Sequence, residues 1–419
     1  MTGYEFLDDK GTFQLERPEE TGYLYFPIAG ERGLKSAITP LLGGDAKTDQ
    51  NHFLMQPVSE QELHNNRNTR NFWCRVEGKG VWSAAGSSAE ETVKRMTGQG
   101  EESRLTAGFM WHQMDRKSEE FGLSSQILSF VPADENVEIM KVSITNIGTE
   151  NVTFTGYGVF PIYGRSADNL RDHRHVTSLL HRIKTTKNSI VVKPVLSFDE
   201  RGHQQNHTVY YVSGVTGEGN APEAFYPCVN DFIGEGGSFD CPGAVYHNLK
   251  GVGADAFIDG YEAAGAMCFE KRMLKPGETV VYILLAGLDE GDNCHEESLA
   301  AFGSEELVNQ AFERTKKYWL EKLNVSFRTG TLDFDNFLGW VSFQPMLRRI
   351  YGCSFLPHHD YGKGGRGWRD LWQDCLALLI MNPKGVKEML LSNFGGVRID
   401  GTNATIIGAK QGEFVADRN

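Results

Sequence analysis

Before residue 300, hydrophobic and polar positions alternate in short runs, which is the pattern of strands with one buried face. In the clearest run, Val137–Asn146, the residues Met140, Val142 and Ile144 alternate with polar side chains. Similar β-branched runs occur at Val152–Ile162, Ser189–Leu196, Thr208–Ser213 and Thr279–Ala286. Gly, Pro, Asn and Asp separate the runs, and the intervening helices that a parallel sheet needs are absent from the pattern. Residues 1–300 are therefore predicted to form a large antiparallel β-sandwich domain.

After residue 300 the hydrophobic period lengthens to the three or four residues of a helix. The first helix is predicted over Ser304–Asn324, with Ser304 as its N-cap and acidic residues in its first turn. Its expected apolar stripe consists of Leu307, Val308, Ala311, Phe312, Tyr318, Trp319 and Leu323. The chain thus changes from mainly β to α at this point.

Two further helices follow. One is predicted over Phe334–Tyr351, with a kink at Pro345. The other begins near Asp370 and carries Leu371, Leu376, Leu379 and Ile380. We interpret residues 301–352 as a helical linker and residues 353–419 as the beginning of a helical domain. Because this last segment is small for an independent domain, we expect the chain to be the N-terminal portion of a longer protein.

Composition narrows the choice of partners. The chain has 419 residues, with 42 basic against 55 acidic side chains and a formal charge of −13, and it has no basic cluster interleaved with aromatics. Nucleic acid and anionic membranes are therefore not expected as partners. The N-terminus lacks the features of a signal peptide, and the apolar stretches are too short to span a bilayer. Seven scattered cysteines without a CxxC pair predict free thiols in the cytoplasm and no zinc site.

The densest cluster of polar residues is Pro357–Asp374, PHHDYGKGGRGWRDLWQD. Its glycines let the backbone approach a ligand closely, and its arginines present fixed donors that suit vicinal hydroxyls or oxyanions. Aspartates accept hydrogen bonds from sugar hydroxyls, and tryptophan offers a flat apolar face to a pyranose ring. If a helix begins near Asp370, then Asp370 and Asp374 lie on one face of it. The cluster is typical of a sugar-binding pocket.

A structural interpretation of the same cluster has equal weight on spacing alone. In that interpretation Arg369 and Asp370 form an ion pair, Asp370 caps the helix, and Trp368 and Trp372 belong to the core. A nucleotide-type phosphate loop is disfavoured, because the order GxxxxGK[ST] is missing.

No metal site or catalytic residue is predicted from the pattern. The adjacent His358, His359 and Asp360 favour a solvated loop over a metal site, because neighbouring histidines point in different directions. Three other histidines lie in the sandwich half: His112, His173 and His175. We expect them to be surface or hydrogen-bonded residues. The carboxylates are too numerous for composition to identify a general acid.

A family resemblance extends over most of the chain. Its most specific part is the run Gly367-Trp368-Arg369-Asp370 followed by Gln373-Asp374, preceded by Trp340, Phe343-Gln344, Ser354-Phe355 and the glycine-rich Gly362–Gly367. The sandwich half adds Ala107-Gly108-Phe109, Phe130-Val131-Pro132, Val137–Asn146 and Tyr157 onward. These elements resemble the cellobiose-phosphorylase family, glycoside hydrolase family 94. The segments YLYFPIAG and NFWCRVEGKGVWSAAG look most similar to its 1,2-β-oligoglucan phosphorylase branch.

The resemblance implies a fold and an activity. The fold is a β-sandwich, a helical linker and an (α/α)6 catalytic barrel, of which residues 353–419 would be the truncated beginning. The activity is phosphorolysis of β-linked gluco-oligosaccharides with inversion, which releases α-glucose 1-phosphate. It implies donor-sugar binding by Arg369 and Asp370, with Arg366, Lys363 and Asp374 as further candidates. Inorganic phosphate would be a co-substrate, and no cofactor is expected.

The resemblance also implies what this chain lacks. The family's catalytic Asp lies later in the barrel and no matching motif occurs here, so no catalytic residue is identified; Asp417 lacks the accompanying Trp and lies too close behind Asp370. The expected partners are an oligosaccharide, phosphate, the C-terminal remainder of the barrel and a second copy in a homodimer. Two alternatives remain: an inverting glycoside hydrolase of similar architecture, and a non-catalytic carbohydrate-binding or assembly module.

Overall fold

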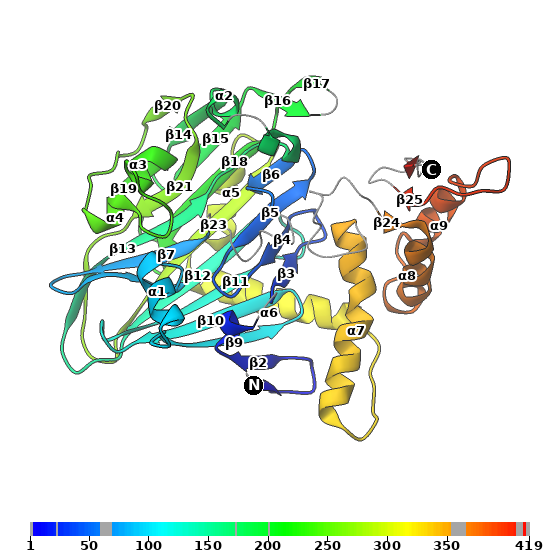
Figure 1. Ribbon diagram of the computed structural model, residues 1–419, viewed down its shortest axis with the longest axis horizontal. Helices are drawn as coiled ribbons and strands as arrows, with labels where there is room; N and C mark the ends of the chain where they lie inside the picture. The colour runs from blue at the N-terminus through cyan, green and yellow to red at the C-terminus, as the bar shows by residue number, and fades with distance from the viewer. Residues whose placement is uncertain are drawn as a thin grey trace.

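The computed structural model describes residues 3–21, 24–58, 69–171, 174–199, 202–352, 366–407 and 414–415. Every pairing between its named strands is antiparallel, as the sequence predicts for the first three hundred residues. The largest sheet has eleven strands (Figure 1). Their order across the sheet is β1 (Tyr4–Phe6), β2 (Phe13–Glu16), β9 (Glu102–Gly108), β10 (Trp111–Ser118), β11 (Leu123–Phe130), β12 (Val137–Asn146), β23 (Thr279–Asp289), β18 (Val209–Thr216), β15 (Ser189–Pro194), β14 (His181–Thr185) and β20 (Phe257–Asp259).

A six-stranded sheet packs against the inner face of this large sheet. It consists of β19 (Ala224–Cys228), β21 (Ala263–Cys268), β13 (Val152–Pro161), β7 (Asn71–Val76) and β8 (Gly80–Ser83), with β22 (Arg272–Leu274) paired to β13. The alternation predicted on β12 is confirmed, because Met140, Val142 and Ile144 are fully buried in the core between the two sheets. The fold class, mainly β followed by α, is confirmed.

A smaller four-stranded sheet lies on the side of the sandwich that faces the C-terminal helices (Figure 1). It comprises β3 (Phe26–Ala29), β4 (Lys35–Ile38), β5 (Gly44–Asp49) and β6 (His52–Met55). A two-stranded ribbon, β16 (Leu196–Asp199) and β17 (Gly202–Gln205), lies at the top of the view in Figure 1. Behind β4, the guanidinium group of Arg70 binds the carboxylate of Glu138, and both side chains are fully buried.

Short helices interrupt the sandwich half, where the pattern predicts none. They are α1 (Ala89–Met96), α2 (Arg174–Ser178), α3 (Val229–Ile233) and α4 (Gly243–Tyr246). They do not change the predicted antiparallel sandwich, because every pairing between the named strands is antiparallel. Each helix is at most eight residues long, too short for a helical period to be visible in the sequence.

The outer face of the large sheet is covered in part by α5 (Cys294–Phe302) and α6 (Glu305–Lys322). Ser304 caps α6, since its hydroxyl accepts a hydrogen bond from the backbone N–H of Leu307, as predicted. The predicted apolar stripe of α6 is mostly confirmed. Val308, Ala311 and Trp319 are buried, and Phe312, Tyr318 and Leu323 are partly buried against the core. The exceptions are Leu307, which is exposed, and Thr315, which is buried although the stripe did not include it.

The helix α7 (Leu332–Tyr351) contains Pro345 and packs against the N-terminal hairpin β1–β2 (Figure 1). The indole N–H of Trp340 donates to the carbonyl of Gly11 at 2.9 Å, and the side-chain amide of Asn336 donates to the carbonyl of Asp8 at 2.7 Å. The chain continues into α8 (Trp368–Met381) and α9 (Val386–Phe394), with a small sheet of β24 (Arg366–Gly367), β25 (Ile406–Ile407) and β26 (Phe414–Val415) beside them.

The cysteines that the structure describes are all free thiols, and five of the six are buried. Within the described residues, none of the helices is both long and apolar enough to cross a membrane.

Candidate functional site

The motif Gly367-Trp368-Arg369-Asp370 forms the start of α8. The helix begins at Trp368, two residues before the predicted position, and Gly367 at the N-cap supplies no side-chain cap. The backbone N–H of Trp368 donates instead to the carbonyl of Thr405 at 2.9 Å. This bond attaches the start of α8 to the residue just before β25 of the small three-stranded sheet. Asp370 lies in the first turn, where a negative charge interacts favourably with the helix dipole.

Arg369 and Asp370 are presented on the surface of this first turn. The Arg369 side chain is 84% exposed and that of Asp370 31% exposed, and Nη2 of Arg369 lies 3.1 Å from Oδ1 of Asp370. The ion pair of the structural interpretation is therefore present. However, an ion pair this exposed contributes little to stability. Both groups keep unused hydrogen-bonding capacity, so together they can donate to and accept from the vicinal hydroxyls of a sugar.

Asp374, one turn further along α8, has a different environment. Its side chain is only 2% exposed, and the Nε of Arg348 lies 3.0 Å from both carboxylate oxygens. Asp374 therefore faces the interior between α7 and α8, although it is four residues from Asp370. In this structure its carboxylate binds protein rather than facing outward beside Asp370.

The two remaining candidates are only partly described. Arg366 lies in β24, and its backbone pairs with Ile407 of β25. Lys363 lies outside the described residues, as do His358, His359 and Asp360. A donor-sugar role for Arg366 and Lys363 stays a prediction.

Trp368 and Trp372 pack against each other and against α9. Their ring centroids are 5.3 Å apart in an edge-on arrangement, and Trp372 contacts Phe394 in the same way at 5.0 Å. The indole N–H of Trp368 points to the carbonyl of Asn393 at 3.4 Å. These internal contacts favour the core interpretation for the two tryptophans over a platform for a pyranose ring.

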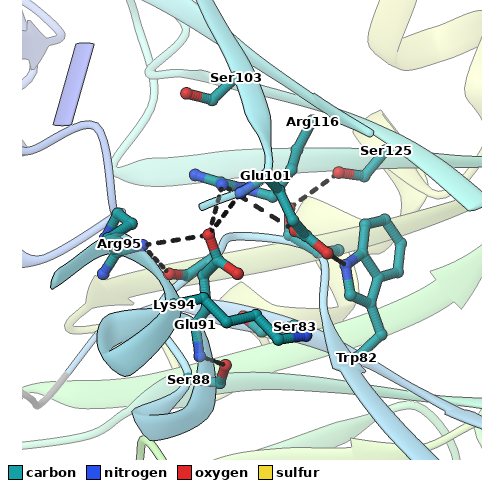
Figure 2. A network of polar contacts seen from close by, with 12 residues as sticks. Trp82, Ser83, Ser88, Glu91, Lys94, Arg95, Glu101, Ser103, Arg116 and Ser125 are labelled. Carbon is teal, nitrogen blue, oxygen red and sulfur yellow. Dashed lines mark hydrogen bonds and ion pairs between the residues drawn. The ribbon is translucent and has the colours of Figure 1, made fainter. Parts of the chain in front are cut away.

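A second cluster of charged side chains is buried in the sandwich, around Arg116 of β10 (Figure 2). Its guanidinium lies 3.3 Å from Glu19, 3.7 Å from Glu91 and 4.0 Å from Glu101. Burial raises the pKa of Glu101, although Trp82 donates its indole N–H to that carboxylate at 3.0 Å. All members have protein partners, so the cluster holds α1 and the N-terminal segment onto the sheet.

The position of Arg116 depends on a glycine. Gly86 has a backbone φ of +71°, and a Cβ atom there would lie 2.2 Å from the guanidinium carbon of Arg116. The guanidinium therefore lies directly against the backbone of Gly86, in the segment just before α1. The sequence pattern gives no sign of this contact, because Gly86 lies in the loop between β8 and α1 whereas Arg116 lies in β10.

The histidine prediction is wrong for His112. This side chain is buried in the core beside Phe26, and neither ring nitrogen has a hydrogen-bond partner among the described residues. Burial, with a smaller contribution from the nearby Arg70 cation, lowers the pKa of His112 to about 3. The ring is therefore neutral at physiological pH. His173 lies outside the described residues, and the side chain of His175 is not described.

Arg348 is the residue that the sequence interpretation missed. In the sequence it is only one of two adjacent basic residues near the end of a predicted helix. Its partner Asp374 lies 26 residues further on, so no local spacing signals the contact. Within the described part of the chain, no three His, Cys, Asp or Glu side chains gather in a way that could hold a metal ion.

Comparison with known protein families identifies the family to which the sandwich half of the chain belongs. The family model for the glycosyl hydrolase 94 supersandwich domain matches residues 51–306. That range includes most strands of both large sheets and ends just inside α6. No curated protein matches the sequence.

Among solved structures, a bacterial glucoamylase in complex with acarbose aligns with a TM-score of 0.54 and 10% identity, over 94% of this chain and 53% of its own. A human-microbiome protein provisionally named a kojibiose phosphorylase aligns with a TM-score of 0.45 and 8% identity, over 95% of this chain and 50% of its own. The chain thus spans about half the length of each of these proteins. At 10% identity, the likeness to the glucoamylase is one of fold alone.

Proposed function

Because the chain belongs to glycosyl hydrolase family 94, whose supersandwich-domain model matches residues 51–306, we propose that the full-length protein is a glycoside phosphorylase. Family membership itself makes the chain part of a carbohydrate-active enzyme family. The proposed reaction is phosphorolysis of β-linked gluco-oligosaccharides with inversion. Its product is α-glucose 1-phosphate, and no cofactor takes part.

The observation that carries this proposal is the presentation of Arg369 and Asp370 on the first turn of α8. The guanidinium supplies several donors in a fixed geometry, and the adjacent carboxylate supplies acceptors. Such a pair can bind two neighbouring hydroxyls of the donor glucose at once. In the proposed site, Arg366 and Lys363 assist from the segment just before the helix.

Phosphate would take the place of the general base and its water in the inverting scheme. One carboxylic acid protonates the departing glycosidic oxygen while phosphate attacks the anomeric carbon from the opposite face. Because phosphate is already an anion near neutral pH, the site needs cationic and backbone donors to bind it rather than a second carboxylate. None of the described residues is assigned as the acid, and Asp417 lies outside them.

The proposal includes an organisation for the whole protein. Residues 1–300 would form the sandwich domain, residues 301–352 the helical linker, and residues 353–419 the beginning of the catalytic (α/α)6 barrel. A cytoplasmic location, a homodimer and a C-terminal remainder of the barrel complete it.

The test is a product assay on the full-length protein with β-linked gluco-oligosaccharides, with and without inorganic phosphate. Phosphate-dependent release of α-glucose 1-phosphate is expected. Hydrolysis without phosphate would instead identify an inverting hydrolase, and no turnover under either condition would leave a non-catalytic carbohydrate-binding module.

The site is tested by Asp370→Ala, which should abolish turnover and leave the fold intact. Glu321→Ala is the matched control, because Glu321 is an exposed helical carboxylate whose recorded partner, Lys317, lies on the same helix at 3.7 Å. Retained turnover in Asp370→Ala would overturn the assignment of the donor site.

A further inference from the structure

We propose that Arg348 is a positioning residue for the candidate donor site. It holds Asp374, and through Asp374 it fixes the first turns of α8, so that Arg369 and Asp370 meet the sugar in one orientation. This inference rests on the proposed function, and it assigns to the site a residue from a different helix.

The contact between Arg348 and Asp374 has the geometry of a strong and oriented ion pair. Nε of Arg348 lies 3.0 Å from both carboxylate oxygens of Asp374, and Nη2 lies 2.5 Å from Oδ1. The planar fork of a guanidinium fixes the carboxylate in direction as well as in distance. Because Asp374 is buried, water competes weakly for its oxygens.

The position of Asp374 determines which part of α8 is fixed. It lies one helical turn after Asp370 on the same helix, so a rotation of α8 about its axis would move both residues together. The N-cap, Gly367, supplies no side chain that could resist such a rotation. The buried Leu371, Cys375 and Leu378 of α8 also pack against α7, and the ion pair with Arg348 adds a directional contact to this packing.

Arg348 is itself held by the sandwich, because the last turn of α7 is attached to β4 and the loop before it. The ammonium group of Lys35 donates to the carbonyl of Ile350 at 2.9 Å, and the hydroxyl of Tyr351 donates to the carbonyl of Ser36. Arg349 adds an ion pair with Glu31 at 2.7 Å.

Beneath β4, the hydroxyl of Ser36 accepts from the buried Arg70, which also binds Glu138. A continuous set of polar contacts thus runs from the sandwich core through α7 to α8. A site needs this kind of support, because a displacement of about 1 Å in a binding group can cost roughly a hundredfold in rate.

The alternative is that the ion pair serves only stability. The two roles differ in what they predict for the folded enzyme. A positioning role lowers kcat/KM at temperatures where each variant is fully folded, whereas a purely structural role lowers the melting temperature and leaves kcat/KM unchanged.

The experiment measures phosphate-dependent kcat and KM of the full-length protein at a temperature well below the melting transition of each variant. Arg348→Met is expected to lower kcat/KM by about tenfold to a hundredfold. Arg348→Lys keeps the positive charge but loses the planar guanidinium, so its kcat/KM should lie between those of the wild type and Arg348→Met. This variant also tests the proposal if Arg348→Met does not fold. Lys317→Met, which removes an exposed helical cation paired with Glu321, is the control and should match the wild type.

A double-mutant cycle then tests whether Arg348 acts through Asp374. Arg348→Met, Asp374→Leu and the double variant should lose similar activity, because the second change removes an interaction that is already absent. Additive losses would overturn the proposal. So would an unchanged kcat/KM in Arg348→Met, and in either case the phosphorylase assignment would stand. Absence of phosphate-dependent turnover in the wild type would instead overturn the proposed function and, with it, this inference.

Discussion

In the sandwich, the charged groups of Arg70 and Glu138 are fully buried and bind each other, whereas on α8 the side chain of Arg369 is 84% exposed and its ion pair with Asp370 is open to solvent. In the sandwich, the two charged groups form hydrogen bonds with each other and with other groups of the protein. The pair on α8 leaves donors and acceptors available to a ligand. The same residue types therefore have different roles in the two regions, and burial together with the number of protein partners separates them.

The largest effect on stability is expected from Arg70→Met. This change leaves the carboxylate of Glu138 buried without its cation, so the free energy of unfolding should fall by about 3–5 kcal/mol. Arg104→Met is the matched control, because Arg104 pairs with Glu16 at 2.7 Å with both side chains half exposed, and it should cost less than about 1 kcal/mol. Denaturant titration measures both values. Equal losses would break the distinction between buried and exposed pairs.

A smaller loss is expected from Gly86→Ala. Both Gly86 and Gly78 have left-handed backbone angles, with φ of +71° and +73°, so alanine at either position introduces strain of about 1 kcal/mol. Only at Gly86 would the new Cβ displace the guanidinium of Arg116, since nothing lies within 4 Å of a Cβ at Gly78. Thermal unfolding should therefore show a loss about 2 kcal/mol larger for Gly86→Ala. Matching losses would mean that Arg116 adjusts freely.

The buried His112 makes the stability of the sandwich depend on pH. Its folded-state pKa, about 3, lies below the usual 6.5, so the unfolded chain binds the proton more readily. Above pH 6.5 the titration of His112 does not lower the free energy of unfolding. As pH falls from 6.5 toward 3, the unfolded chain takes up a proton that the folded chain does not, so the free energy of unfolding decreases. Between pH 6 and 4.5 this one group should cost about 2 kcal/mol.

The variant His112→Leu should remove that part of the pH dependence in denaturant titrations at several pH values. His207→Leu, at an exposed position, should retain it. An unchanged slope in His112→Leu would show that His112 gains a proton without unfolding.

The smallest effect on stability is expected from Arg369→Ala, although this change should strongly reduce activity. Arg369→Ala should change the free energy of unfolding by less than about 0.5 kcal/mol, because its side chain is mostly solvated. It should nevertheless lower phosphorolysis by about a hundredfold or more, since a charged hydrogen bond to the substrate is lost. A large loss of stability would support the structural interpretation of the motif.

The sequence predicts those elements whose signals are local. In the second half of the strand Val137–Asn146, buried Met140, Val142 and Ile144 alternate with partly exposed polar side chains, and this local alternation identifies the strand. The N-cap Ser304 is also local, because its hydroxyl contacts a backbone group three residues away. The exposed pair of Arg369 and Asp370 is visible for the same reason, as its members are adjacent.

The features that escape prediction depend on distant partners. The four-residue strands β3, β4 and β6 are too short for alternation to be recognised. The burial of Asp374 depends on Arg348 in another helix, and the core position of His112 depends on the packing of two sheets. Neither contact leaves a pattern in a single stretch of sequence.

The middle of the large sheet has a consequence for how the chain is made. The strands β12 and β23 pair along their full length, yet residues 147–278 separate them in sequence. Loop closure over such a distance is slow, so this sheet cannot be completed until residue 289 has left the ribosome. Until then, the edge of β12 exposes unpaired backbone groups beside apolar side chains, and the growing chain is open to aggregation or chaperone binding during that interval.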